Sequence, residues 1–134
     1  MVSLNKGIFC YELFDRSVNK ERFVFFLKKL RKKHGEGKII LYQDNLKVHL
    51  SNLAKDCYKD LNIVPLYAPV YSPQYNPIEF CFSKLKGIVK KMRLNDMMTK
   101  RKRTYRQLVP LAVQKITIED VDNCIRHVHR IYGL

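Results

Sequence analysis

This sequence has few acidic residues and no recognisable export signal. It carries 12 Asp and Glu against 26 Lys and Arg, a formal net charge of +14 over 134 residues. Residues 1–6 lack the apolar core of a signal peptide, and no apolar run approaches the roughly 20 residues that span a bilayer. These absences argue against a secreted or membrane-spanning class. We expect a soluble, intracellular protein with no membrane partner.

Cysteine is scarce as well, and its spacing is uninformative. The four cysteines, at positions 10, 57, 81 and 124, form no C-x-x-C pair. A disulfide framework or a zinc knuckle is therefore a poor explanation. Thiols in a reducing compartment fit better.

The length and the charge set the remaining limits. A chain of 134 residues, 46% hydrophobic, can bury one core and is expected to be globular. The excess of positive charge predicts a polyanionic partner, with nucleic acid first and an anionic membrane surface second. A basic but inert surface is the alternative, and the clustering of the basic residues argues against it.

Strand and helix patterns alternate along the first part of the chain. Strands are predicted at residues 7–14, 38–43 and 62–67. Helices are predicted from Asn19 to Gly35, from about Lys47 to Leu61, from Asn76 and Pro77 onward, over 108–116 with a break at Pro110, and after a capping box at Thr117–Asp120. This order predicts an α/β fold followed by C-terminal helices. The strand at 38–43 is too apolar to alternate, which predicts burial on both faces of a parallel sheet.

Two acidic residues stand at places where ligands bind in such folds. Asp44 follows the predicted strand at 38–43, and Glu79 lies just inside a predicted helix. If the two elements pack together, the carboxylates converge at the carboxyl end of the sheet and can bind a hard divalent cation. Taken singly, each acid has a simpler explanation, Asp44 as a turn residue and Glu79 as the capping-box partner of Asn76.

The residues around these acids form two motifs. Gln43-Asp-Asn-x-x-x-His49, followed by Tyr71-Ser-Pro-x-x-Asn-Pro-Ile-Glu79, resembles the mariner-like superfamily of cut-and-paste DNA transposases. The gap between the acids, residues 45–78, is 34 residues long, a characteristic value for one branch of that superfamily. Asp44 would match the second and Glu79 the third of the family's three catalytic acids. The resemblance covers Ser3 to about Arg93.

The resemblance implies a fold and an activity. The expected fold is a ribonuclease-H-like mixed sheet flanked by helices over residues 1–93, followed by a basic linker and C-terminal helices over 94–134. The expected activity is metal-dependent DNA strand cleavage and strand transfer, with Asp44 and Glu79 as catalytic residues and as ligands of two Mg²⁺ or Mn²⁺ ions. The implied partners are transposon ends and target DNA, and the full-length enzyme could be a homodimer. A nuclear location is expected in a eukaryote, and a cytoplasmic one otherwise.

The sequence also departs from the family pattern. Gln74, Tyr75 and Phe82 replace a usual Asp, Leu and Trp. More seriously, residues 7–14 align with the third strand of the fold, so its first strand, most of its second and the first catalytic Asp are absent. We therefore expect an N-terminally truncated domain with an incomplete two-metal site.

Candidate DNA-binding residues come from the motifs and from a basic segment. Between residues 84 and 106 there are ten Lys and Arg against a single acid. Such a segment would contact phosphates in a salt-dependent way. The candidates are Asn45, His49, Lys84, Lys86, Lys90, Lys91, Arg93, Lys100, Arg101, Lys102 and Arg103.

Three hypotheses follow. The first is a partial transposase catalytic domain. The second is a transposase-derived basic DNA-binding protein that has lost catalysis. The third is an unrelated α/β protein in which both acids are helix caps.

Overall fold

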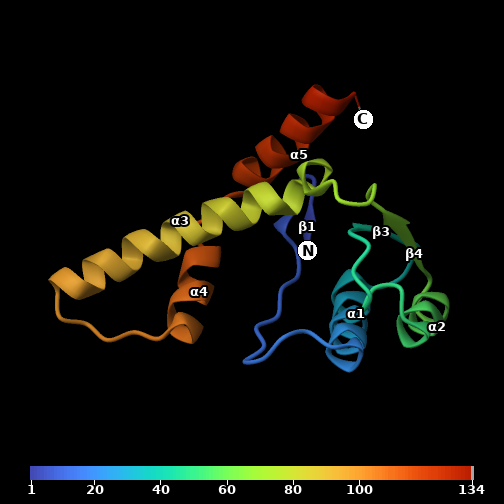
Figure 1. Ribbon diagram of the computed structural model, residues 1–134, viewed down its shortest axis with the longest axis horizontal. Coiled ribbons are helices and arrows are strands. Elements are labelled where there is room, and N and C mark those ends of the chain that lie inside the picture. Colours follow the sequence, from blue (N-terminus) through green and yellow to red (C-terminus); the bar gives the residue numbers. More distant parts are fainter. Residues whose placement is uncertain (134) are drawn as a thin grey trace. The chain divides into compact units, whose positions relative to one another are not determined.

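The computed structural model describes residues 1–133, which fold into two compact units (Figure 1). The middle unit is Cys10–Asn76, and the terminal unit joins Met1–Phe9 to the chain from Pro77 onward. The described residues form five α-helices and two sheets of two strands each, which confirms the α/β class. Among them, no helix is long and apolar enough to cross a membrane.

The middle unit is built around a parallel strand pair. Its elements are α1 (Lys20–His34), β3 (Ile39–Gln43), α2 (Asn52–Asp60), β4 (Ile63–Tyr67) and the short 3₁₀ helix η1 (Pro73–Tyr75). β3 pairs in parallel with β4, in a register that sets Ile39 beside Ile63. α2 provides the crossover that parallel strands require. The parallel sheet predicted for the strand at residues 38–43 is confirmed.

Helix α1 forms as its sequence predicts. The Asn19 side chain accepts a hydrogen bond from the backbone N–H of Arg22 at 2.9 Å and so caps the first turn. The residues at i, i+4 and i+7 of its apolar stripe, Phe23, Leu27 and Leu30, are buried. Gly35 ends the helix at a φ of 79°, a backbone conformation that suits glycine.

The prediction that β3 is buried on both faces is wrong. Its burial alternates, so that Ile39 is 3% exposed while its neighbour Ile40 is 64% exposed. Only one face of the two-stranded sheet is covered. The other face presents exposed apolar side chains, namely Ile40, Tyr42 and Leu66.

Helix α2 begins later than predicted. Residues 47–50 form a turn, and Ser51 caps the helix by accepting from the N–H of Ala54 at 3.3 Å. The apolar spacing that suggested a start at Lys47 includes Leu50, which is largely exposed. A side-chain cap fixes the first turn more strongly than the apolar period does.

The terminal unit joins a short hairpin to three helices. Its elements are β1 (Val2–Ser3), β2 (Gly7–Ile8), α3 (Pro77–Met98), α4 (Tyr105–Val113) and α5 (Ile118–Tyr132). The strand predicted over residues 7–14 is wrong beyond Ile8, because β1 offers a partner for two residues only. The hairpin is attached to α5, since the N–H of Asn5 donates to the Asp122 carboxylate at 2.9 Å.

The C-terminal helices begin at capping boxes. Thr117 and Asp120 bond reciprocally, at 3.0 and 3.1 Å, and start α5 as predicted. Thr104 and Gln107 do the same for α4. The predicted break at Pro110 is wrong, because α4 continues through that residue to Val113. The Pro110 ring removes one backbone hydrogen bond, but burial of Leu108 and Ala112 against α3 stabilises the helix.

The predicted domain boundary between residues 93 and 94 falls within α3. The division into 1–93 and 94–134 stays a prediction.

The alternating burial of β3 predicts opposite effects of two adjacent substitutions. Ile39→Thr should lower the free energy of unfolding by about 1–3 kcal/mol, because it removes a buried methyl group and introduces a buried hydroxyl. Ile40→Thr should leave the melting temperature unchanged and reduce light scattering on storage, since it removes an apolar group from the exposed face of the two-stranded sheet. Equal melting temperatures for the two variants would contradict the observed register.

Candidate functional site

Asp44 directly follows the last residue of β3. The sheet bonding reaches this point, because the N–H of Ala68 donates to the carbonyl oxygen of Gln43 at 2.8 Å. The Asp44 side chain is 46% exposed, but its Oδ1 atom is buried. This atom lies 2.8 Å from Nδ1 of His49. The same nitrogen is 3.0 Å from the Asp44 carbonyl oxygen, so Nδ1 of His49 lies within hydrogen-bonding distance of two oxygen atoms of Asp44.

His49 is held in place from several sides. Its ring packs against that of Phe23 with centroids 4.5 Å apart. Its carbonyl oxygen accepts from the hydroxyl groups of Tyr58 at 3.2 Å and Tyr67 at 3.4 Å. The Gln43 amide in turn donates to Tyr58 at 2.7 Å. These contacts fix the ring beside Asp44.

The buried Tyr58 is suited to this task. Burial raises the pKa of its hydroxyl group well above the ordinary value, which keeps the group protonated. A protonated hydroxyl can accept from Gln43 and donate to His49 at the same time. Sequence reasoning did not single out Tyr58, because its role depends on bonds to Gln43 and His49, which lie 15 and 9 positions away in the chain.

Asn45 takes part in the structure of the strand end. Its side-chain amide donates to the carbonyl oxygen of Ala68, directly after β4. This bond ties the segment after β3 to the segment after β4. The predicted DNA contacts of Asn45 and His49 stay predictions.

Glu79 lies in the first turn of α3, and its side chain is exposed. A carboxylate there interacts favourably with the positive end of the helix dipole. Asp44 belongs to the middle unit and Glu79 to the terminal unit, and each is described within its own unit. The convergence of the two carboxylates stays a prediction. Phe82, which replaces the usual Trp of the family, is 44% exposed.

The donor atoms at Asp44 fit a divalent cation. The Asp44 side chain is partly exposed, so a cation can reach its carboxylate group from solvent. Hard cations such as Mg²⁺ and Mn²⁺ prefer oxygen ligands of this kind. Among residues 1–133, no three His, Cys, Asp or Glu side chains come together as a metal site.

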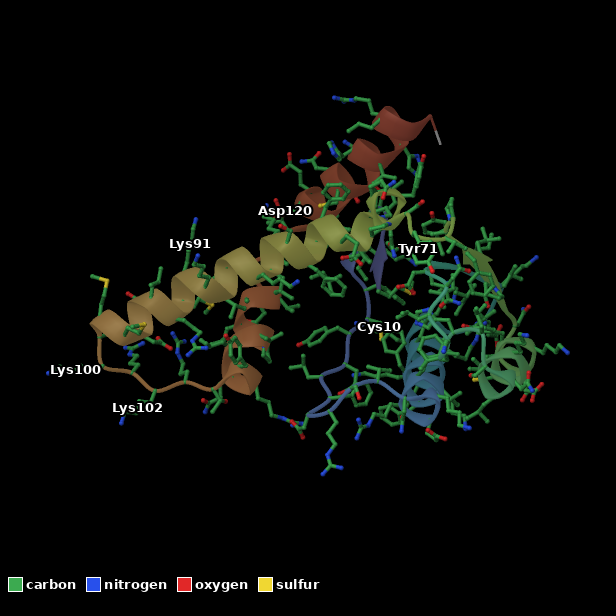
Figure 2. All side chains as sticks on the ribbon, in the orientation of Figure 1. Cys10, Tyr71, Lys91, Lys100, Lys102 and Asp120 are labelled. Atoms are coloured by element: carbon green, nitrogen blue, oxygen red, sulfur yellow. The ribbon has the colours of Figure 1, made fainter. Side chains whose placement is uncertain are left out.

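The basic segment is carried by α3, the following loop and the start of α4. Most of its side chains are exposed, and Figure 2 shows Lys91 pointing away from α4 and Lys100 and Lys102 on the loop. Two of the predicted DNA-binding residues have structural partners instead. Lys84 pairs with Asp120 of α5, and Arg103 pairs with Asp96 of α3.

The pairing of Asp96 with Arg103 closes the loop between α3 and α4. Asp96 is only 4% exposed, and its carboxylate accepts from Nε of Arg103 at 2.8 and 3.1 Å and from Nη2. The backbone N–H of Arg101 also donates to the Asp96 carbonyl oxygen at 2.8 Å. The hydrogen bonds from Arg103 hold the pKa of Asp96 below its ordinary value. The sequence marked Asp96 only as the single acid in a basic segment.

A comparison with known families gives a match over most of the chain. A family model described as DDE superfamily endonuclease matches residues 1–101. No curated protein matches the chain significantly. The family match includes Asp44 and Glu79 and ends before α4 begins.

Replacing Asp96, the buried acid of α3, should expose the loop that follows this helix. In Asp96→Asn, trypsin should cleave after Lys100, Arg101 and Lys102 several-fold faster than in the wild type, because Arg103 loses its charged partner. Asp56→Asn, an exposed change on α2, is the matched control.

The effect should depend on pH in one direction. The pKa of Asp96 is lower in the folded chain, so its stabilising effect is present above about pH 4, the ordinary value for Asp, and is lost as the pH falls through the lowered pKa. The melting temperatures of wild type and Asp96→Asn should therefore differ at neutral pH and converge in acid. A difference that persists in acid would contradict the ion pair.

Proposed function

We propose that this chain, which belongs to the DDE superfamily of endonucleases, is a partial catalytic domain of a mariner-like transposase. Members of this superfamily are transposase-like nucleases that act on DNA and generally use divalent metals. The proposed activity is strand cleavage and strand transfer at transposon ends. The observation that carries the proposal is the family match over a segment that holds both acid motifs, 34 residues apart.

Asp44 and Glu79 are the proposed ligands of Mg²⁺ or Mn²⁺. When bound, such ions activate an attacking oxygen and stabilise the leaving oxygen of a phosphodiester. The chain itself supplies orientation. His49, fixed by Phe23 and Tyr58, holds the Asp44 carboxylate at the end of β3.

The local fold supports this assignment. The β3–α2–β4 unit places Asp44 at the carboxyl end of a parallel strand, where α/β folds bind ligands. The proposed complete fold is ribonuclease-H-like, with β3 and β4 as neighbours in its sheet. The resemblance assigns Asp44 and Glu79 to the second and third of three catalytic acids, and two carboxylates by themselves would hold a metal ion weakly.

A second candidate function is DNA binding without catalysis. The observation that favours it is the exposed basic segment on α3 and the loop that follows. Phosphate contacts by these lysines and arginines need neither acid. In a eukaryotic host the proposed location is the nucleus. The basic run Lys100–Arg103 would then serve as an import signal.

Catalysis can be tested with two conservative substitutions. Nicking of supercoiled DNA in Mn²⁺ by the full chain should fall to the metal-free background in Asp44→Asn and in Glu79→Gln, because each removes a ligand charge. The matched controls are Asp56→Asn on α2 and Glu119→Gln, which lies in the first turn of α5 as Glu79 does in α3. Equal nicking by all five proteins would refute the metal assignment, and no nicking by any would favour the second candidate.

Phosphate binding can be tested by its salt dependence. The affinity for duplex DNA should fall steeply with salt, and Lys100→Ala/Lys102→Ala should reduce the log–log slope by about 1.8, since each phosphate contact contributes about 0.9. Lys55→Ala/Lys59→Ala on α2 removes the same charge elsewhere and should leave the slope nearly unchanged. A flat salt dependence of the wild type would exclude the basic segment as a DNA-binding surface.

A further inference from the structure

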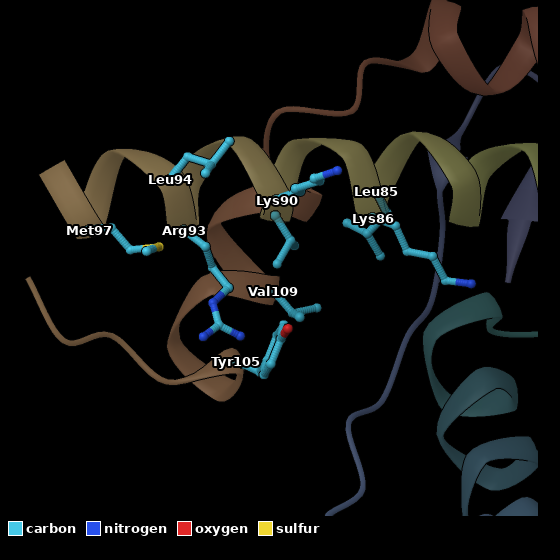
Figure 3. A pocket seen from close by; sticks show the side chains of 9 residues that line it. Leu85, Lys86, Lys90, Arg93, Leu94, Met97, Tyr105 and Val109 are labelled. Atoms are coloured by element: carbon cyan, nitrogen blue, oxygen red, sulfur yellow. The ribbon is translucent and has the colours of Figure 1, made fainter.

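A groove of about 520 Å³ lies between α3 and the start of α4, entirely within the terminal unit (Figure 3). Its size is within the range of small-ligand sites. Part of its lining is apolar, from Leu85 and Val89 of α3 and Val109 of α4. The rest includes three cationic side chains and one aromatic ring, which are Lys86, Lys90, Arg93 and Tyr105.

The three cations share one face of α3, because positions 86, 90 and 93 are spaced by four and three residues. Within the described chain, none of them forms an ion pair, whereas Lys84 and Arg103 are paired with Asp120 and Asp96. Their charge therefore remains available to a ligand. The positive charge of the groove by itself favours an anionic ligand.

The aromatic ring adds a second requirement. Tyr105 is 59% exposed, and the guanidinium group of Arg93 lies 4.7 Å from the centre of its ring. Figure 3 shows the two side chains pointing toward one another across the groove. A planar cation beside an exposed ring is a surface on which a flat, unsaturated ligand can stack.

Duplex DNA meets only one of these two requirements. It presents phosphates to a basic surface, but its base faces are covered by stacking on their neighbours. Single-stranded DNA presents both phosphates and free base faces. An amphipathic acidic helix would complement the charge and the apolar lining, but it supplies no flat group that stacks on the Arg93–Tyr105 pair.

We propose that the groove between α3 and α4 binds unpaired nucleotides of single-stranded DNA. Lys86 and Lys90 contact the phosphates, and a base stacks at Tyr105 and Arg93. The inference rests on the proposed function to the extent that the partner is DNA. It extends that function to residues outside the family match, since Tyr105 and Val109 lie beyond residue 101.

The test compares two DNA forms and a set of variants by fluorescence anisotropy. The probes are a short labelled oligothymidylate and a hairpin duplex of equal charge. Tyr105→Ala should weaken oligothymidylate binding by roughly five- to hundredfold, the range for loss of one stacked base, and leave duplex binding unchanged. Tyr105→Phe keeps the ring and should bind as the wild type does. Circular dichroism confirms that each variant is folded.

The cationic contacts have a matched control on the same helix. Lys86→Ala and Lys90→Ala should each weaken oligothymidylate binding more than Lys91→Ala, because Lys91 does not line the groove and points away from α4. Equal losses for all three would show that only net charge matters and would overturn the groove assignment.

The remaining outcomes separate the two proposals. Duplex binding with no effect of Tyr105→Ala on either probe would refute the groove and leave the proposed function intact. Absence of binding to both probes would refute both. Binding of an acidic amphipathic peptide that depends on Tyr105, without binding of oligothymidylate, would assign the groove to a protein partner instead.

Discussion

The ion pair between Asp96 and Arg103 is the constraint on which the second half of the terminal unit depends. A carboxylate that is almost fully buried must be paired, because an isolated buried charge is too costly to retain. Arg103 meets this need with its planar, two-pronged donor group, and in doing so it closes residues 99–104 into a loop. That closure sets Tyr105 beside Arg93 and brings Leu108 and Ala112 against α3. The candidate DNA-binding groove is therefore a consequence of one charged contact.

In the middle unit, neutral groups position an acidic residue. There the exposed acid, Asp44, is positioned by His49, and His49 is positioned by a ring contact and by tyrosine hydroxyl groups rather than by a counter-charge. The two acids thus have different surroundings. Asp96 is buried and its charge is paired within the fold, whereas the Asp44 side chain is partly exposed and open to an external cation.

Local signals in the sequence predicted the features that depend on local physics. The Asn19 cap, the Thr117 capping box and the family motifs around Asp44 and Glu79 are short-range patterns, and the caps are confirmed in the structure. The errors arose where a distant partner decides the outcome. The strand at residues 7–14 stops at Ile8 for lack of a pairing partner, and one face of β3 is left exposed, because an apolar strand cannot by itself specify what covers it. The role of Asp96 depends on Arg103, seven residues further along the chain, and on the closing of the loop between α3 and α4.

The position of Arg103 has a consequence for the history of the chain. The family match ends at residue 101, so the acid and the base of this ion pair lie on opposite sides of that limit. If the segment after residue 101 were replaced by another, Asp96 would be left as an unpaired buried charge in α3 unless position 96 changed as well. Recombination at this limit is thus constrained by electrostatics. Asp96 and Arg103 must therefore be inherited together.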